Sequence, residues 1–486
     1  MSNLRQSVAK GVVRIVATAL PTDPWAPFRP AVPAPGVGTG FVYPLDTMDK
    51  CGTLRFIVTC YHVVEHCHDG DVHVQLPPDN DRFKAHVVSV CPDLDLALLV
   101  VDQIQDRVAV NYTLADLPDL GQTVYAAGYP LAKALTVSAG EYTAFEDGKL
   151  KHSAPIDPGN SGGPLFVADE SGGIQCVGMS DSGKPGASNT AFAVPMQVIR
   201  YAMPHMLCEK TCRASPMAPE RVLRLPTTGI VYHRGLEKGS GVTVRDVHPE
   251  SVFHGLLRKG DHVTHIRVNG GGGSAHAINH NGTVQWRWPG KLMEDVSLPE
   301  FLLLHDPWKA KISFARPPGA VAVAAGATKW TPALLAGLVH PYTMRRWTVY
   351  DGSVPHRRIG ALFLGNLHGG HFSNERGPQS IEPFCINATG DQQFRDRVAV
   401  LYVVPGSKVH QQGTVVSGTI LEQVNGVPVA TLRDVDRALG TNGGATGGGS
   451  TGAPVTLLFR NGVHLALGPD LLQAEEAHAA RLVPVS

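Results

Sequence analysis

The 486-residue chain is predicted to be mainly β and to form several domains. Its 53 glycines and 37 prolines suit a fold with many turns between short strands. Short runs rich in Val, Ile, Phe and Tyr, each ended by Gly, Pro or Asp, recur through residues 10–200, which is typical of an all-β barrel or sandwich. The chain exceeds one typical core, so we expect about three domains of roughly 100–200 residues each.

The strands of this first stretch are identified by their β-branched and aromatic residues. The Pro-rich segment 21–36 is expected to be a loop, because proline cannot donate to a central ladder. Residues 195–210 read as a closing helix, interrupted near Pro204. The predicted strands are 12–20, 38–45, 54–61, 72–76, 85–90, 96–101, 123–130, 176–180 and 190–195.

The rest of the chain is predicted to hold two related modules and a tail. Residues 222–316 and 330–468 share an order of strand, turn, short helical piece, glycine, second strand and the letters V-N-G. This is a weak internal repeat of a small αβ module. A flexible Gly-rich loop at 440–452 precedes the last strand of the second module, and 469–486 reads as an amphipathic helical tail.

Composition excludes several classes of protein. Lys and Arg number 42 and Asp and Glu also number 42, so charge favours neither nucleic acid nor a membrane surface. Lys10 and Arg14 interrupt the apolar pieces of the N-terminus, which therefore lacks the core of a signal peptide. No apolar run is long enough to span a bilayer. We expect a soluble intracellular protein of the cytoplasm, nucleus or an organelle lumen, without nucleic-acid partners.

The eight cysteines are irregularly spaced, which predicts reduced and mostly buried thiols. The stretch CYHVVEHCHDG at 60–70 crowds cysteines and histidines together and invites a metal site. It contains no standard zinc spacing, however. The sequence therefore predicts neither a metal nor a cofactor.

The segment DPGNSGGPLF at 157–166 places Ser161 among three glycines. Glycine tolerates positive φ and close approach, so such a turn can present a hydroxyl and two backbone N–H groups to one point. Acyl transfer needs that arrangement, with a hydroxyl as nucleophile and N–H groups to stabilise the oxyanion. Asn-Ser-Gly is also an ordinary turn sequence, so the segment needs a base and an acid elsewhere in the chain.

His62 follows a predicted strand and is the candidate base. Asp93 and Asp95 stand against the apolar run at 96–101, where an acid is costly to bury unless it is hydrogen-bonded. They would share one strand face, so spacing does not choose between them. The order His62, Asp95, Ser161 is the chain order of chymotrypsin-like enzymes and differs from two other orders of the same triad.

The chain resembles the HtrA/Deg serine proteases through six motifs in the same order. The resemblance implies that residues 1–208 are a chymotrypsin-like double β-barrel protease domain, and it selects Asp95 because the family's acid directly precedes Leu-Ala or Ile-Ala. The motifs are GTGF (38–41), TCYHVV (59–64), DLALL (95–99), GYP (128–130), PGNSGGPLF (158–166) and AFAVP (191–195).

The same resemblance assigns the remaining site residues. The backbone N–H groups of Gly159 and Ser161 would form the oxyanion hole, and Asn160 would be structural within the turn. The segment AFAVP matches the strand that walls the primary specificity pocket, where small side chains imply an apolar pocket for aliphatic residues. The pocket residues expected from this match are Ala191, Phe192 and Ala193.

The two modules are similar to PDZ domains, and the whole arrangement resembles the plant-type Deg subgroup that includes Deg2 and Deg9. The resemblance implies an ATP-independent endopeptidase of protein quality control that cleaves unfolded or damaged proteins and assembles as trimers or their multiples. Asp157 and Tyr61 depart from the family's usual residues. A second hypothesis is therefore a catalytically silent scaffold that binds peptides through its PDZ modules.

Overall fold

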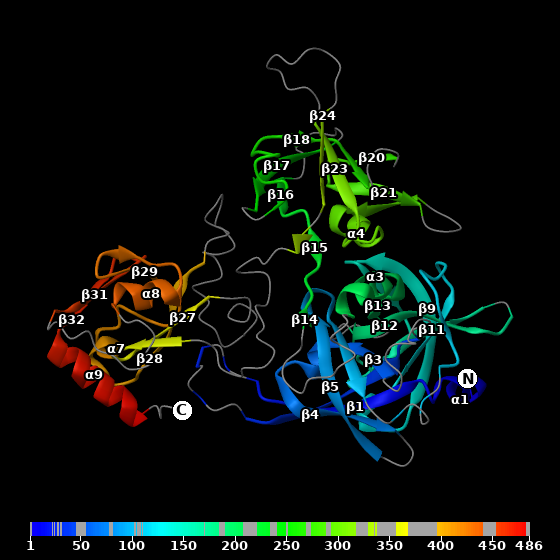
Figure 1. The fold of residues 1–486 in the computed structure, drawn as a ribbon, viewed down its shortest axis with the longest axis horizontal. Coiled ribbons are helices and arrows are strands. Elements are labelled where there is room, and N and C mark those ends of the chain that lie inside the picture. The colour runs from blue at the N-terminus through cyan, green and yellow to red at the C-terminus, as the bar shows by residue number, and fades with distance from the viewer. Residues whose placement is uncertain are drawn as a thin grey trace. The chain divides into compact units, whose positions relative to one another are not determined.

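The structure is a computed structural model of the whole chain, and Figure 1 shows its ribbon. It divides into two compact units, Met1–Ala19 with Ala34–Leu338 and Leu20–Pro33 with Val339–Ser486. The structure describes residues 2–21, 23, 25–26, 29, 32–44, 55–76, 81–101, 104, 108, 110–169, 171–183, 190–207, 221–233, 241–248, 251–268, 274–287, 293–316, 329–334, 336–337, 356–367, 396–440 and 453–482.

The first barrel is a closed antiparallel sheet in the order β5-β4-β1-β2-β3-β6, and β6 pairs with β5 to complete the ring. The helix α1 (Ser2–Val8) precedes it, and the short helices α2 (Tyr61–Val64) and η1 (Pro92–Leu94) follow β3 and β5. Its strands are β1 (Val12–Ala19), β2 (Ala34–Val42), β3 (Arg55–Cys60), β4 (Cys67–Leu76), β5 (Asp81–Cys91) and β6 (Leu96–Val101).

The second barrel closes in the same way, in the order β11-β8-β9-β10-β13-β12 with β12 pairing back to β11. The strand β7 (Thr113–Leu114) adds to β12 in parallel. The helix α3 (Met196–Met206) follows and runs through Pro204, so the predicted interruption there was wrong. The barrel strands are β8 (Thr123–Gly128), β9 (Thr136–Glu146), β10 (Lys149–His152), β11 (Pro164–Ala168), β12 (Ile174–Gly183) and β13 (Ala191–Pro195), and η2 (Pro130–Ala132) follows β8.

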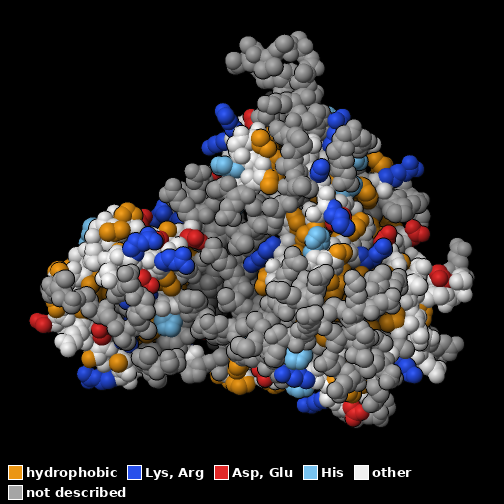
Figure 2. Space-filling model, in the orientation of Figure 1, with side chains coloured by type: hydrophobic (Ala, Val, Ile, Leu, Met, Phe, Trp, Pro, Cys, Tyr) orange, Lys and Arg blue, Asp and Glu red, His pale blue; other side chains and the backbone are white. Residues whose placement is uncertain are grey.

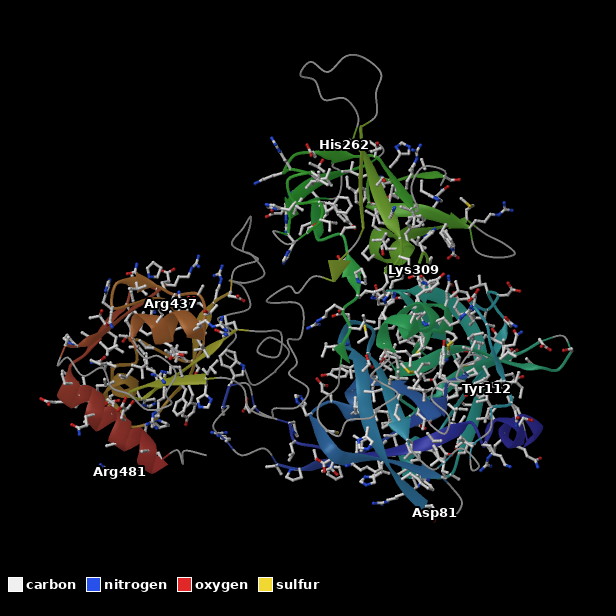
Figure 3. All side chains as sticks on the ribbon, viewed as in Figure 1. Asp81, Tyr112, His262, Lys309, Arg437 and Arg481 are labelled. Atoms are coloured by element: carbon white, nitrogen blue, oxygen red, sulfur yellow. The ribbon has the colours of Figure 1, made fainter. Side chains whose placement is uncertain are left out.

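The two closed barrels confirm the prediction of a mainly β, chymotrypsin-like double barrel. A single buried cluster runs from the first barrel into the second and includes Phe41, Phe56, Phe166 and Met179. Tyr112 lies in the segment between the barrels (Figure 3), and its hydroxyl donates to the Val42 carbonyl at 2.5 Å. This shared core fixes the two barrels against each other, so residues from both can form one site.

The same unit continues into a module with its own core, which includes Phe253, Ile266, Phe301 and Phe314. Its contact with the helix that follows the barrels includes the Gln197 Nε2–H bond to the Leu304 carbonyl at 3.2 Å. The elements are β14 (Arg221–Val222), β15 (Pro226–Thr227), β16 (Ile230–His233), β17 (Val242–Val247), β18 (His262–Val263), β19 (His265–Val268), β20 (Ala275–Ala277), β21 (Thr283–Arg287), β22 (Met293–Ser297), α4 (Leu298–Leu303), β23 (Lys311–Arg316), β24 (Lys329–Leu334) and β25 (Ala336–Gly337).

The second unit is built on one antiparallel sheet in the order β26-β27-β28-β29-β31-β32, with β30 on β29. Its V-N-G letters form a tight turn in which Asn425 and Gly426 have φ values of 50° and 76°. The elements are β26 (His356–Ile359), β27 (Leu362–Asn366), β28 (Val398–Val403), α7 (Lys408–Gln412), β29 (Ile420–Val424), β30 (Val427–Pro428), α8 (Leu432–Ala438), β31 (Val455–Phe459), β32 (His464–Leu467) and α9 (Pro469–Leu482).

One buried residue of the second unit comes from the N-terminal part of the chain. Trp25, in the segment predicted only to be a Pro-rich loop, is 7% exposed. It belongs to a small core cluster with Leu367, Ala399, Leu401 and Ile420. A large aromatic ring contributes much apolar area to such a cluster, so this segment is part of the second unit's core.

The described surface bears out the balanced charge. Figure 2 shows Lys, Arg, Asp and Glu side chains scattered over the visible described surface rather than gathered over one element. Within the described ranges, no helix has the length and apolar character needed to cross a membrane. Cys60, Cys67, Cys91 and Cys176 are free and buried, as predicted for them, and the other four cysteines lie outside the described residues. Residues 441–452 of the predicted Gly-rich loop also lie outside them.

Candidate active site

His62 and Asp95 meet at the end of the first barrel. The one-turn helix α2 directly follows β3, and its first amide, Tyr61 N–H, donates to the Asp95 carbonyl at 2.9 Å. The His62 amide donates to Asp95 Oδ1 at 2.8 Å, and His62 Nδ1 lies 2.6 Å from Asp95 Oδ2. Backbone and ring are thus held by the same carboxylate. This fixes the proton on Nδ1 and leaves Nε2 as the basic nitrogen of the neutral imidazole.

The electrostatics of this pair favour its charged form. Burial alone would lower the pKa of His62, but the hydrogen bond and negative charge of Asp95 outweigh it and raise that pKa above 6.5. Burial alone would raise the pKa of Asp95, but its hydrogen bonds and the charge of His62 outweigh burial and lower it below 3.8. The carboxylate therefore stays ionised at neutral pH and stabilises an imidazolium.

Asp93 is directed to a different partner. Its carboxylate accepts from the Arg224 guanidinium at 3.3 Å and from the Leu225 amide at 3.0 Å. Asp95 instead has φ 51° and ψ 43° at the end of η1, in the left-handed region, where Asp is tolerated better than most residues. The left-handed residue breaks the strand alternation on which the two acids would have shared a face.

The loop of Ser161 has the backbone shape that its glycines suggested. Gly159 has φ 103°, and a Cβ there would come within 2.6 Å of the Tyr129 carbonyl oxygen. Gly162 has φ 86°, and a Cβ there would lie 2.2 Å from the Thr39 carbonyl oxygen. Among the described residues, the amides of Gly159 and Ser161 donate no hydrogen bond. Two N–H groups with no internal acceptor are what an oxyanion hole requires.

Two buried threonines of the first barrel hold this loop, and the sequence reasoning assigned no role to either. Thr39 donates its hydroxyl hydrogen to the Gly159 carbonyl at 2.6 Å, and its amide donates to the Ser161 carbonyl at 2.9 Å. Thr59 in turn donates to the Thr39 carbonyl at 2.8 Å. Thr39 lies within the GTGF motif, so the available signal was a polar residue in an otherwise apolar strand.

Ser161 and a further acid, Asp181, meet on the second barrel. The Ser161 hydroxyl donates to the Asp181 backbone carbonyl at 3.2 Å. The Asp181 side chain is 6% exposed and forms an ion pair with Lys149 of β10. The sequence reasoning missed Asp181, although an acid in the apolar stretch CVGMSDSG carries the same signal that singled out Asp95.

The predicted pocket residues lie on β13 between β10 and β12. Ala191 and Ala193 are buried at 2% and 0% exposure, whereas Phe192 is half-buried and faces the other way. The side chain of Ala193 packs in the core of the second barrel. Ala191 pairs with His152, a buried histidine whose ring nitrogens have no hydrogen-bond partner among the described residues.

The metal site considered at 60–70 does not assemble from that stretch among the described side chains. Cys60, His62, Asp95 and Asp181 each offer a donor atom, and these atoms lie within 4.8 Å of one another. The Cys60 thiol donates to the Ser180 carbonyl at 3.3 Å, and burial raises its pKa well above 9.0. Cys60 therefore stays protonated and is a poor metal ligand. The expected absence of a metal stays a prediction.

Two closed barrels with a His–Asp pair on one and a serine loop on the other define a trypsin-like peptidase domain. The family model for the trypsin-like peptidase domain matches residues 38–179. About a third of the chain is similar to curated proteins named DegP-like and Do-like proteases. The finer placement near Deg2 and Deg9 stays a prediction.

Three comparisons illustrate the relationship. The chain is 34% identical over 182 residues to Protease Do-like 1, chloroplastic, of Arabidopsis thaliana, which is 34% of this chain and 38% of the relative. It is 29% identical over 185 residues to a probable periplasmic serine endoprotease DegP-like of Chlamydia muridarum, which is 35% of this chain and 34% of the relative. The chain thus spans little more than a third of the length of these curated relatives.

A solved structure is similar over a longer stretch. The HtrA-type protease AlgW with tripeptide matches 69% of this chain and 96% of its own length, with 18% identity and a TM-score of 0.45.

Proposed function

We propose that the chain is an ATP-independent serine endopeptidase that cleaves unfolded or damaged proteins through an acyl-enzyme. The observation that carries the proposal is the double hydrogen bond from His62 to Asp95, formed beside a serine loop with two amides that donate to no group in the described part of the chain. An imidazole oriented by a carboxylate, a nearby hydroxyl and convergent N–H groups are the parts of an acyl-transfer site. Relationship to serine proteases supports the same reading.

Each group has one role in the proposed reaction. His62 Nε2 takes the hydroxyl proton as Ser161 Oγ bonds to the peptide carbonyl carbon, and the amides of Gly159 and Ser161 stabilise the oxyanion. The C–N bond then breaks, and His62 gives that proton to the leaving amine. A water that gives a proton to His62 attacks the ester carbonyl carbon. The C–Oγ bond then breaks, His62 returns that proton to Ser161 Oγ, and the acid is released. Asp95 stays ionised throughout and stabilises the imidazolium.

The hydroxyl must rotate before it can react. In the structure Ser161 Oγ donates to the Asp181 carbonyl, and the attack requires it to donate to His62 Nε2 instead. Rotation about one side-chain bond is a small change, and catalytic hydrogen bonds often form only when substrate binds. If the hydroxyl never rotated, Ser161 would stay bonded to the Asp181 carbonyl. The chain would then be the second candidate, a catalytically silent scaffold.

The remaining proposals concern the modules and partners. Residues 222–316 and 330–468 are proposed PDZ-like domains, 1–208 the protease domain and 469–486 the helical tail. Unfolded proteins and peptides are the proposed partners, a trimer or its multiple is the proposed assembly, and the intracellular location stays a prediction. Ala191, Phe192 and Ala193 are proposed to wall an apolar specificity pocket, with Ala193 contributing backbone because its side chain is in the core.

A fluorophosphonate probe and casein turnover test the proposal together. The probe reacts only with a serine that has an active base and oxyanion hole, so wild type should be labelled at Ser161 and should cleave casein. Ser161→Ala should lose both, by on the order of 10⁴-fold or more for turnover, with an unchanged melting temperature. Casein cleavage that survives in pure Ser161→Ala would reject the nucleophile. An unlabelled, folded wild type would favour the scaffold.

A further inference from the structure

Asp181 touches both halves of the proposed catalytic group. Its backbone carbonyl accepts from Ser161 Oγ at 3.2 Å. Its carboxyl group neighbours that of Asp95, and the two groups shift each other's pKa. Donor atoms of Asp181, Asp95 and His62 lie within 4.8 Å of one another. A residue that links nucleophile and acid in this way can influence the base between them.

The Asp181 side chain is buried but not isolated. It is 6% exposed, and a charge at such a depth needs a partner. The partner is the Lys149 ammonium, whose side chain reaches in from β10 and is 34% exposed. Breaking a pair of this kind leaves an uncompensated charge, which is costly. The Lys149 ammonium therefore favours the ionised form of Asp181, whose negative charge then lies beside Asp95.

We propose that Asp181, with Lys149 as its counter-ion, is a positioning residue that supports Asp95 and sets the basicity of His62. This inference rests on the proposed function, because the basicity of His62 matters only if His62 is the general base. The charged groups linked to the His62 imidazole are thus two acids, Asp95 and Asp181, and one cation, Lys149. Their combined charge, rather than Asp95 alone, stabilises the imidazolium.

The groups that face Asp181 come from four elements. They are Lys149 on β10, Asp95 at the end of η1, His62 on α2 and the Cys60 thiol on β3. Burial raises the pKa of Asp181 first, the neighbouring Asp95 raises it further, and Lys149 opposes both. The negative charge of Asp181 in turn raises the pKa of His62, together with Asp95 and Glu65.

The net charge of these groups predicts the direction in which the pKa of His62 should change. With Asp95 and Asp181 ionised and Lys149 protonated, the group behind His62 carries one net negative charge. Asp181→Asn keeps the side-chain size and replaces the carboxylate by a neutral amide, which makes that net charge zero. The pKa of His62 should then fall by about one unit. Activity needs neutral His62, so the acid limb of the pH profile should move to lower pH by the same amount.

The double variant Asp181→Asn with Lys149→Met is the decisive comparison. It removes the cation as well and restores one net negative charge. Its acid limb should return to within about 0.3 pH unit of wild type, because a pKa follows the local charge. A purely structural role predicts instead that the two changes lower activity at every pH without moving the limb. Lys151→Met is the matched control, since Lys151 lies on the same strand but pairs with Glu146.

Two readouts on the full chain keep this inference separate from the proposed function. The rate of fluorophosphonate labelling, measured as a function of pH, gives the position of the acid limb of the pH profile. Nuclear magnetic resonance of ¹⁵N-histidine, with His62→Gln to assign the resonance, reports the pKa of His62 without any activity. A lowered pKa in Asp181→Asn that returns in the double variant supports the inference. An active wild type whose limb and His62 pKa are unmoved by Asp181→Asn overturns it. A pKa that moves in a protein that no probe labels would reject the proposed function alone.

Discussion

Thr39 donates its hydroxyl hydrogen to the Gly159 carbonyl at 2.6 Å, across 120 residues of sequence. The same hydroxyl accepts from the Tyr129 amide at 3.0 Å, and the Thr39 amide donates to the Ser161 carbonyl at 2.9 Å. All of these atoms are held in the buried interior between the barrels. A strand of the first barrel therefore fixes the serine loop of the second, and with it the direction of the Gly159 and Ser161 amides.

Thr39→Val should disturb this loop more than it disturbs the fold. The change keeps the shape but leaves the Gly159 carbonyl without its donor, which costs about 1–3 kcal/mol at a buried group. We expect a fall of on the order of 10–100-fold in the fluorophosphonate labelling rate, because the oxyanion amides lose their fixed direction. Thr143→Val is the control, since the Thr143 hydroxyl bonds the exposed Lys151 carbonyl. Equal labelling of both variants would show that Thr39 does not position the loop.

The variants Asp95→Asn and Asp93→Asn should differ sharply in turnover. Asp95 accepts from both the amide and the ring of His62, and Asn would favour the wrong imidazole tautomer. The loss should be roughly 10⁴-fold in turnover at neutral pH, as in the trypsin template. Asp93 bonds Arg224 and Leu225, so Asp93→Asn should leave peptide turnover within about threefold and mainly loosen that contact. A large loss in Asp93→Asn with an active Asp95→Asn would reassign the acid.

The change Asp157→Asn should have almost no effect on turnover. Asp157 precedes Pro158, which favours an extended conformation, and its side chain is exposed. Solvent screens a charge in that position from the oxyanion site. Turnover of one peptide substrate should match wild type within about twofold. A rise of tenfold or more would mean that the carboxylate faces the oxyanion and acts as a brake.

His152 should make the fold sensitive to acid. Burial lowers the pKa of this histidine from 6.5 to about 4, so the folded state resists a proton that the unfolded state accepts. The free energy of unfolding should therefore be full above about pH 6.5 and decrease as pH falls toward 4, by on the order of 3 kcal/mol. Urea unfolding of wild type and His152→Gln at several pH values checks this. The variant should show a shallower loss over that window, and parallel curves would contradict the assignment.

The sequence determined much of the fold class and the order of the site. Frequent Gly and Pro between β-branched runs are local signals, and they correctly predicted a mainly β chain. The glycines around Ser161 are also local, because only glycine takes φ 103° at a position where a Cβ would meet the Tyr129 carbonyl. The motif before the apolar strand likewise selected Asp95, whose contact with His62 joins two segments that the pairing of β3 with β6 brings together.

Other features depended on contacts that no local pattern contains. Asp181 and Lys149 form an ion pair across 32 residues, and Thr39 meets Gly159 across the two barrels. Trp25 looked like part of a loop, yet its ring is buried in a core made by residues far along the chain. Sequence alone therefore determined which residues could do chemistry and the turns that present them. Only the tertiary structure decided which charges and hydrogen bonds surround them, because burial and pairing arise when distant strands close into barrels.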